Sequence, residues 1–513
     1  MKVIIAGGVA AGTKAAAKLK RECPDAQVEL YTKGTDISYA GCGLPYYIGG
    51  VIGDREALIV NTPQKFMGLT GGSVHTGCEV TALDAAAKTV VAGGETVSYD
   101  KLILAVGAEP VVPPVAGTQL RGVFTVRTPD DAIGLRDYIQ AERCQRAVVV
   151  GGGFIGLEVA ENLMKQGLSV TLMDMADQLM PNILDPEMAD YACRQLRKDG
   201  LRILTGTPLK AIEGGVKAEG VQTGMGRLPA ELVVLAVGIR PATDFLRGSG
   251  LELEKGAIVT DALHRTNLPD VYAVGDCALV HNRLTGKPQW SAMGSTANIA
   301  GRALALELAG EARPYPGCLG TGVVKLNDHL NAARTGLTEA QARDAGYDAE
   351  SVVCVLDDKA HYYADADSFV LKLIADRRDH KLLGLQVLGA GAVDKAADVA
   401  VMAISMGTTL EQLLPMDFAY APPFSTAIHP VAAAAGILLN KLAGKLNSFT
   451  PAQYAAGGAK GYRLLDAHPQ PTIPGAEWID LPKTGNMLPN MGRMRSCCWS
   501  VPRASGAIWS RIG

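Results

Sequence analysis

The chain has 513 residues, a formal net charge of -3 and a composition that is 48% hydrophobic but only 5% aromatic, with 59 glycines. This length exceeds one ordinary domain, the composition is typical of an α/β protein, and the near-neutral charge argues against a nucleic-acid partner. The longest apolar stretches, such as residues 431–439, are shorter than the roughly 20 residues that cross a bilayer, and no secretion signal precedes the first strand. We therefore expect a cytoplasmic protein without a membrane segment. The ten cysteines form no CxxC pair, so we expect no metal site.

The first elements predict a Rossmann unit, with a strand at 2–6, a glycine turn at 7–12, a helix at 13–21 and a strand at 27–32. Such glycines let the backbone approach a pyrophosphate at the helix N-terminus. Val9 stands at the middle glycine position, and Thr32 stands where an acid usually holds the ribose, so a purely structural turn is the alternative. The candidate cofactor-binding residues are Gly7, Gly8, Ala10, Ala11, Gly12, Thr32 and Lys33.

A second unit, residues 146–174, matches G-x-G-x-x-G with all three glycines and ends on an acid. Asp174 lies at the distance expected of a ribose ligand, and its charge would repel a 2′-phosphate. The unit predicts NADH or NADPH as a cofactor, with NADH favoured. The candidate residues are Gly151, Gly153, Phe154, Ile155, Gly156 and Asp174.

Two such units, about 145 residues apart, imply two dinucleotides, which in a redox chain means FAD and NAD(P)H. A third segment, the strand at 271–274, ends in Gly275-Asp276. A carboxylate there suits the ribityl and phosphate region of a flavin, although a plain turn is the alternative. Its position predicts that the first domain is completed by returning chain.

Together these motifs make residues 1–446 resemble the two-dinucleotide flavoprotein disulfide reductases. Two crossover strands of that family correspond to residues 102–107 and 233–238, which adds Gly107 and Gly238 to the cofactor candidates. The resemblance implies an α/β fold with two Rossmann-like domains and an α+β dimerisation domain, and therefore a homodimer. The expected domains are FAD-binding at 1–110 and 247–321, NAD(P)-binding at 111–246 and dimerisation at 322–446.

Cys42 lies in ISYAGCGLPYYIGG, between two glycines and just before Pro45. This pattern predicts a loop entering a helix, whose dipole would lower the pKa of the thiol and make it a nucleophile. A buried cysteine in a glycine turn is the alternative. Relatives with a dithiol carry their second cysteine where Tyr47 stands, so Cys42 must oxidise to a sulfenic acid or to a mixed disulfide with a small thiol.

The segment around Cys42 is most similar to coenzyme A disulfide reductases and persulfide reductases. Peroxidase and oxidase relatives carry a histidine where this chain has Ala10, which cannot act as an acid or base. Three cations recur on one face of the first helix, and a solvated basic face is the alternative interpretation. The resemblance implies that the substrate is held by Lys14, Lys18, Arg21, Ser38 and Gly41, the last standing where asparagine is usual.

The last third changes character, with strands at 368–374 and 382–387 and a helix at 392–406. The resemblance carries over Tyr420, Tyr362 and Tyr363 as catalytic candidates near the flavin and sulfur, with ordinary interface tyrosines as the alternative. Residues 447–513 are expected to be a linker and an incomplete rhodanese-like tail, because 461–481 resembles only the start of such a domain. We expect Cys497 and Cys498 not to be catalytic.

The predicted function is an FAD-dependent NAD(P)H oxidoreductase that reduces coenzyme A disulfide, persulfide or polysulfide through Cys42. The main alternative is an NADH oxidase or peroxidase that cycles through a sulfenic acid. Two others are a reductase of an electron-carrier protein, for which Cys42 would be dispensable, and a catalytically silent redox sensor with weak FAD retention.

Overall fold

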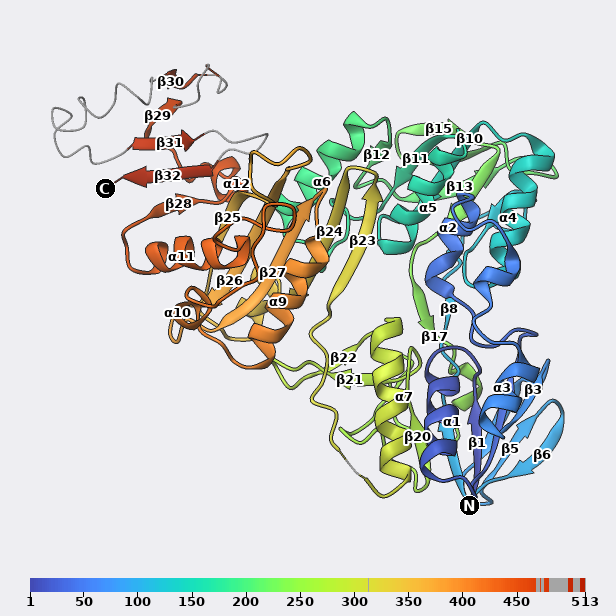
Figure 1. Cartoon of the computed structure of the whole chain (residues 1–513). Coiled ribbons are helices and arrows are strands. Elements are labelled where there is room, and N and C mark those ends of the chain that lie inside the picture. The colour runs from blue at the N-terminus through green and yellow to red at the C-terminus, as the bar shows by residue number, and fades with distance from the viewer. Residues whose placement is uncertain (312, 467–470, 472–474, 479–496, 502–507, 513) are drawn as a thin grey trace. The chain divides into compact units, whose positions relative to one another are not determined.

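The computed structural model describes residues 1–311, 313–466, 471, 475–478, 497–501 and 508–512 (Figure 1). The chain divides into two compact units, residues 1–177 with 201–318 and residues 178–200 with 319–513. The predicted NAD(P)-binding domain, 111–246, includes residues 178–200, whereas the structure groups these residues with the second unit. Among the described residues, we find no helix long and apolar enough to cross a membrane.

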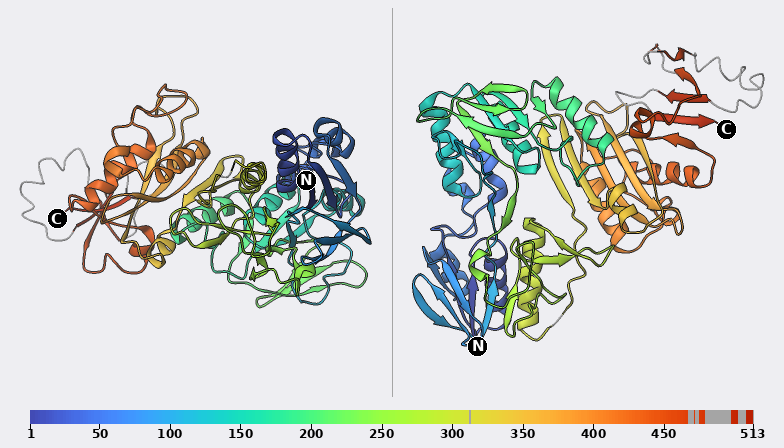
Figure 2. Two further views of the ribbon diagram at one scale, coloured as in Figure 1. Left: turned by 90° about the horizontal axis from the view of Figure 1, so that it is seen from below. Right: turned by 180° about the vertical axis from the view of Figure 1, so that it is seen from behind.

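The first sheet of unit 1 has the order β20-β7-β1-β2-β3 and is parallel throughout. Its strands are Val271–Ala273, Lys101–Leu104, Lys2–Ala6, Gln27–Thr32 and Ser73–Thr76. Helix α1 (Ala11–Glu22) follows β1 and packs beside α7 (Gly294–Leu308), as Figures 1 and 2 show. The returning strand β20 completes this sheet, so the prediction that later chain closes the first domain is confirmed.

The second sheet of unit 1 is also parallel, in the order β12-β11-β10-β16-β9. Its strands are Arg202–Leu204, Ser169–Met173, Arg146–Val150, Leu232–Leu235 and Val123–Phe124, and helix α5 (Phe154–Lys165) follows β10. Apolar runs such as AVVV are buried, as parallel strands covered on both faces require.

The two predicted crossover strands end earlier than the sequence indicated, at Leu104 in β7 and Leu235 in β16. Gly107 and Gly238 follow with φ of 74° and 117°, values that favour glycine. Two short antiparallel strands come next, β8 (Ala108–Pro110) and β17 (Ile239–Pro241). Three-residue strands give too little alternation to be recognised from sequence.

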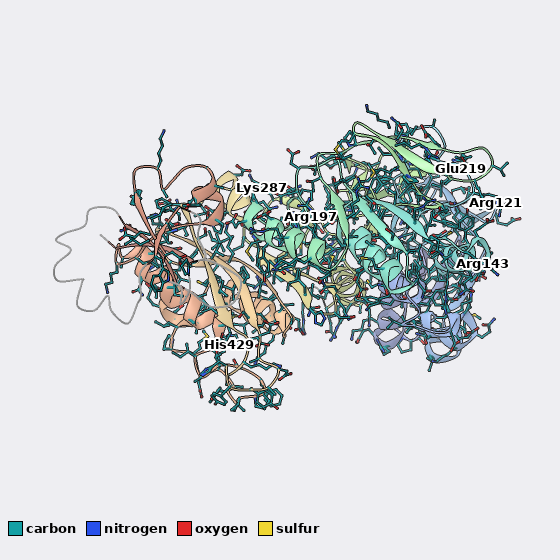
Figure 3. The ribbon with its side chains drawn as sticks, turned by 90° about the horizontal axis from the view of Figure 1, so that it is seen from above. Arg121, Arg143, Arg197, Glu219, Lys287 and His429 are labelled. Atoms are coloured by element: carbon teal, nitrogen blue, oxygen red, sulfur yellow. The ribbon has the colours of Figure 1, made fainter. Side chains whose placement is uncertain are left out.

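Unit 2 is built on an antiparallel sheet in the order β23-β24-β27-β26-β25. Its strands are Gly322–Asn327, Leu330–Gly336, Leu382–Gly389, Ser368–Asp376 and Ala349–Asp357. Helix α9 (Val393–Ser405) packs on β24 and β27, whereas α11 (Pro430–Leu442) packs on β25 and β26. His429 caps α11 by accepting the Val431 amide at 3.3 Å (Figure 3).

A buried ionic cluster joins α6 (Pro186–Lys198) to this sheet. The Lys372 ammonium, 1% exposed, lies 3.0, 2.8 and 2.7 Å from the carboxylates of Asp185, Glu187 and Glu339. Burial lowers the pKa of Lys372, but the three carboxylates outweigh it and raise the pKa to about 12. Gln386 completes the cluster by donating to Asp185 at 2.7 Å. These contacts explain why α6 belongs to unit 2.

The tail adds a sheet in the order β28-β32-β31-β29-β30. Its strands are Asn447–Phe449, Ile508–Ile512, Cys497–Val501, Arg463–Asp466 and Glu477–Trp478. Strands β31 and β32 lie outside the segment 461–481 that resembles the start of a rhodanese domain. Cys497 and Cys498 lie in β31, but their side chains are outside the described residues. The rhodanese-like character of the tail stays a prediction.

Candidate active site

Both glycine loops are shaped for a dinucleotide. A side chain at Gly7 would place its Cβ 2.0 Å from the Ala105 carbonyl oxygen, and one at Gly12 would come within 1.9 Å of the Gly7 oxygen. In the second loop, Gly156 meets the Gly151 oxygen at the same distance, while Gly153 faces open space. These contacts force close packing of strand, loop and helix, and they leave room for a pyrophosphate. Gly8 packs on the side chains of Leu30, Thr32 and Ile37.

Helices α1 and α5 each begin without a side-chain cap, after Ala10 and Gly153. Their first amide groups are therefore available to an anionic ligand, as in other dinucleotide sites. Ala11 opens α1 as a buried residue, and Phe154 and Ile155 open α5, with Ile155 37% exposed.

Asp174, the acid that ends the second unit, is hydrogen-bonded to the glycine loop of that unit. Asp174 Oδ2 accepts the Gly152 amide at 2.6 Å, and Oδ1 accepts the Ala176 amide at 2.8 Å. In the first unit, the equivalent Thr32 is buried beside Gly8, while Lys33 is exposed and lies 3.1 Å from Glu79. Thr32 brings no carboxylate, so the usual ribose ligand is absent at that position.

Gly275 and Asp276 follow β20. Gly275 has φ of 80°, and a Cβ there would lie 3.0 Å from that of Ala11, so the loop is fitted to the start of α1. The Asp276 carboxylate lies 3.3 Å from Arg127, and its backbone carbonyl accepts the Trp290 indole N–H at 2.7 Å. Arg127, from the segment before α4 (Pro129–Glu142), was not singled out from sequence.

Cys42 lies in a 3-10 turn, η1 (Gly41–Gly43), directly before the short helix α2 (Leu44–Ile48). Although the residue is exposed, the atoms packed around the sulfur raise the pKa of the Cys42 thiol, and the charges of Glu158 and Asp276 raise it further against the opposing effect of Arg127. The prediction that the helix dipole lowers the pKa of the Cys42 thiol was therefore wrong. Helix α2, whose dipole was expected to lower this pKa, has only five residues. The carboxylates that raise the pKa, Glu158 and Asp276, come from distant segments of the chain.

A tyrosine and a glutamate that were not predicted from the sequence also lie beside this turn. The Tyr46 hydroxyl donates to Glu158 at 3.1 Å, which links α2 to α5. Burial raises the pKa of Glu158 to about 7, Tyr46 opposes that rise and Glu161 adds to it. The only sequence signal was an acid two residues after Gly156, in the apolar first half of the helix.

The predicted substrate residues occupy the start of unit 1. Ser38 is in the left-handed region, φ 48°, and its amide donates to the Gly8 carbonyl at 2.9 Å. Gly41 is exposed, and a Cβ there would meet only the Tyr39 ring, at 3.9 Å. Along α1, Lys18 pairs with Glu22, while Lys14 is half-buried and Arg21 exposed. Glu22 therefore reduces the positive charge of this face.

The structure brings together two of the three predicted tyrosines. The hydroxyls of Tyr362 and Tyr420 lie 3.3 Å apart in unit 2, and that hydrogen bond raises the pKa of Tyr420. Tyr363 is 40% exposed on the same turn. All three phenols are accessible to a second molecule.

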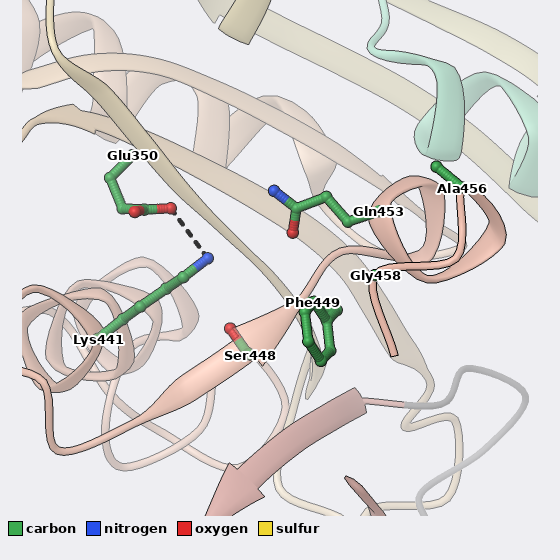
Figure 4. A pocket seen from close by; sticks show the side chains of 7 residues that line it. All are labelled: Glu350, Lys441, Ser448, Phe449, Gln453, Ala456 and Gly458. Carbon is green, nitrogen blue, oxygen red and sulfur yellow. Dashed lines mark ion pairs between the residues drawn. The ribbon is translucent and has the colours of Figure 1, made fainter. Parts of the chain in front are cut away.

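A cavity of about 420 Å³ lies in unit 2, and none of the predicted site residues lines it (Figure 4). Its lining includes Ser448, Phe449, Gln453, Ala456 and Gly458. The Lys441 ammonium at its wall already lies 2.9 Å from Glu350 and donates to the Ser351 carbonyl at 2.8 Å. The two charged residues at the cavity wall, Lys441 and Glu350, are therefore already paired with each other.

Comparison with known proteins gives two family matches. Residues 1–300 match the model of pyridine nucleotide-disulphide oxidoreductases, and residues 327–432 match the dimerisation domain of the same family. The second match lies within the predicted 322–446 domain.

Individual relatives span almost the whole chain. The NAD(P)H coenzyme A polysulfide/persulfide reductase of Pyrococcus horikoshii is 34% identical over 85% of this chain and 98% of its own. An NADH oxidase of Methanocaldococcus jannaschii is also 34% identical, over 87% of this chain and 100% of its own. The structure of reduced Bacillus anthracis CoADR-RHD superposes with a TM-score of 0.92 at 32% identity, over 97% of this chain and 92% of that chain.

The predicted α/β fold, the FAD and NAD(P)H cofactors and the enzyme class agree with these matches, and the glycine loops fit both dinucleotides. The chain therefore belongs to the pyridine nucleotide-disulphide oxidoreductase family.

Proposed function

We propose that this protein uses NAD(P)H and FAD to reduce a persulfide, polysulfide or disulfide of coenzyme A at the sulfur of Cys42. The observation that carries the proposal is an exposed cysteine in a glycine-flanked turn directly before helix α2. The names of the Pyrococcus relative and of the Bacillus structure support this substrate class.

In the proposed reaction, the Cys42 thiolate attacks one sulfur of the substrate disulfide. The first thiol leaves as a thiolate and takes up a proton, and a mixed disulfide with Cys42 remains. Two electrons then break this bond, which releases the second thiol and restores Cys42. FAD, held at the first glycine loop, would supply those electrons; they would come from NAD(P)H together with one proton, and solvent would supply the second proton.

We assign the dinucleotides as the order of the motifs suggests. The loop from Gly7 to Gly12, with Thr32, Lys33, Gly107, Gly275 and Asp276, would hold FAD. The loop from Gly151 to Gly156, with Asp174 and Gly238, would hold NAD(P)H, and the Asp174 carboxylate would favour NADH. FAD would lack the usual ribose carboxylate, because Thr32 occupies its place.

The phosphates of coenzyme A would lie on α1. Lys14, Lys18 and Arg21 supply cations there, and Ser38 and Gly41 lie on the loop that leads to Cys42. Since Lys18 already pairs with Glu22, Lys14 and Arg21 are the stronger electrostatic partners for phosphate in this set.

A homodimer would supply the remaining groups. Tyr420, Tyr362 and Tyr363 are exposed in the unit that carries the dimerisation match, together with large apolar side chains such as Phe424 and Ile428. We propose that these phenols reach the active site of a second copy, where one could protonate a leaving thiolate. We place the dimer in the cytoplasm, a reducing compartment in which the eight described cysteines would stay free thiols.

The test is NADH consumption without oxygen, in the presence of coenzyme A disulfide or coenzyme A persulfide. The wild-type protein is expected to consume NADH with a sulfur substrate, Cys42→Ser should fall to background, and Cys23→Ser serves as the matched control. Unchanged turnover in Cys42→Ser would refute the sulfur mechanism and favour an electron-carrier reductase. Light scattering should give the mass of two chains.

The second candidate is an NADH oxidase, which the Methanocaldococcus relative favours. In that case oxygen or peroxide would consume NADH faster than any sulfur substrate, and Cys42 would pass through a sulfenic acid that dimedone traps. Ala10, which has no acid or base at the position of the expected histidine, favours the sulfur substrate.

A further inference from the structure

The contact between Tyr46 and Glu158 joins the cysteine turn to the NAD(P)-binding domain. Tyr46 stands four residues after Cys42, on the short helix α2, and its hydroxyl donates to Glu158 Oε1 at 3.1 Å. Glu158 stands four residues after Phe154, which opens α5. The pair therefore links the helix that follows the cysteine turn to the helix that follows the second glycine loop.

Close packing fixes this pair in place. A side chain at Gly49, directly after α2, would come within 2.0 Å of the Asn162 amide oxygen on α5, and Asn162 is fully buried. The Asn162 amide nitrogen donates to the Glu158 carbonyl at 2.8 Å. On the other side of α2, Arg136 stacks over the Tyr47 ring at 4.8 Å. Helix α2 thus has little freedom to move its tyrosine away from Glu158.

The charged and titratable groups that interact with the Cys42 sulfur come from four segments of the chain. Glu158 on α5 and Asp276 after β20 both disfavour its thiolate, and Arg127 before α4 favours it. Tyr46 lies on α2 and interacts electrostatically with both Cys42 and Glu158. Of the two carboxylates, only Glu158 is held by the tyrosine of the cysteine helix.

We infer that Tyr46 and Glu158 form a proton-holding pair that sets how readily Cys42 ionises, with Glu158 acting on the sulfur as a positioning residue. When Glu158 carries a proton, the thiolate faces one negative charge fewer; when Glu158 ionises, the thiolate is disfavoured. The sulfur and the carboxylate therefore titrate as a coupled system rather than independently. The inference rests on the proposed function only in taking Cys42 as the reacting sulfur.

The test measures the rate at which iodoacetamide alkylates Cys42 between pH 5 and 10, in FAD-bound protein, by mass spectrometry of the Cys42 peptide. Glu158→Gln is expected to move the profile to lower pH and to raise the rate at pH 7 by on the order of threefold to tenfold. The wild-type profile should be broader than that of the variant, because two groups share its protons.

Two further variants separate this role from a structural one. Tyr46→Phe keeps the ring but removes the donor that stabilises ionised Glu158, so its profile should also move to lower pH, by less than in Glu158→Gln. Glu161→Gln removes from the same helix a charge that disfavours ionised Glu158, so it should move the profile slightly to higher pH. Bound FAD and the unfolding midpoint confirm that each variant is folded.

Identical profiles in the wild type, Glu158→Gln and Tyr46→Phe would overturn the inference, as would a slower alkylation at pH 7 in folded Glu158→Gln. Turnover is a separate readout. If coenzyme A substrates are not reduced but the profiles shift as expected, the proposed substrate fails while the proton-holding pair stands. If turnover is as proposed but the profiles coincide, only the pair fails.

Discussion

The guanidinium of Arg127 lies 3.3 Å from the carboxylate of Asp276, and both charges act on the sulfur of Cys42. The pair joins the segment before α4 to the loop after β20, two parts of unit 1 that are far apart in sequence. Arg127 is the one cation among the charges that shift the pKa of Cys42 in the described residues.

Replacing Arg127 should therefore make Cys42 less reactive. Because Arg127 lowers the pKa of the thiol, Arg127→Met is expected to raise that pKa and to slow alkylation at pH 7.5 by about threefold. The matched control is Arg121→Met, since Arg121 pairs with Glu142 at 2.8 Å and does not act on the sulfur (Figure 3). Equal loss of reactivity in both variants would contradict the electrostatic explanation.

The second glycine loop offers a matched pair of substitutions. Gly156→Ala would press its Cβ to 1.9 Å from the Gly151 oxygen, so we expect a loss of about 2 kcal/mol in unfolding free energy. Gly153→Ala meets open space and should leave stability within about 0.5 kcal/mol of the wild type while raising the KM for NADH. Urea unfolding and steady-state kinetics check the two effects. Equal destabilisation in both would show that the loop is looser than described.

Gly41 is a site for a gain of affinity. A Cβ there meets only the Tyr39 ring, at 3.9 Å, so asparagine can enter without overlap. Gly41→Asn is expected to lower the KM for a coenzyme A substrate by roughly threefold to tenfold, through one added hydrogen bond, with kcat unchanged. Gly34→Asn, at another exposed and open glycine, is the control and should leave KM unchanged.

The buried cluster around Lys372 should dominate the stability of unit 2. Lys372→Met leaves three carboxylates without their cation, so we expect a loss of about 3–5 kcal/mol, measured by urea unfolding at pH 7. Burial raises the pKa of Glu339, but Lys372 outweighs it and lowers the pKa. This stabilisation is therefore present above pH 4.5 and is lost as pH falls through the lowered value.

The difference between Lys372→Met and the wild type should accordingly shrink below pH 4.5. The control is Lys325→Met on the same sheet, whose ammonium lies 2.7 Å from Asp328 at the surface and should contribute less than about 0.5 kcal/mol. A constant difference between pH 3 and pH 8 would argue that Lys372 acts through packing alone.

His264 should make unit 1 sensitive to acid. The ring is 2% exposed and stacks on Tyr315, and burial lowers the pKa of His264 to about 4, with Asp261 opposing and His281 adding to the shift. Between pH 6.5 and 4, His264 is therefore protonated in the unfolded chain but neutral in the folded one. The free energy of unfolding falls by up to about 3 kcal/mol as the pH drops through that window. His264→Phe should flatten this decline in urea unfolding, whereas exposed His329→Phe should not.

How much of the structure can be predicted from the sequence depends on how far apart in the chain the interacting residues lie. The strand at 27–32 and the helix at 13–21 follow from local hydrophobic period and glycine spacing, and both were predicted within two residues. The pKa of Cys42 was predicted wrongly, because it is raised first by the atoms packed around the sulfur and then by Glu158 and Asp276, which no local pattern links to the cysteine. Likewise, nothing near Asp185 in sequence indicates its contact with Lys372.

The placement of residues 178–200 with unit 2 has a consequence for how the protein can be divided or recombined. The chain passes between the units at 177/178, 200/201 and 318/319, so neither unit is one continuous segment. A cut at 318 would leave Asp185 and Glu187 on the N-terminal fragment and separate them from Lys372 and Glu339 on the other. In gene fusions and domain exchange, α6 should therefore be kept together with the C-terminal half. In limited proteolysis, α6 should likewise be assigned to that half.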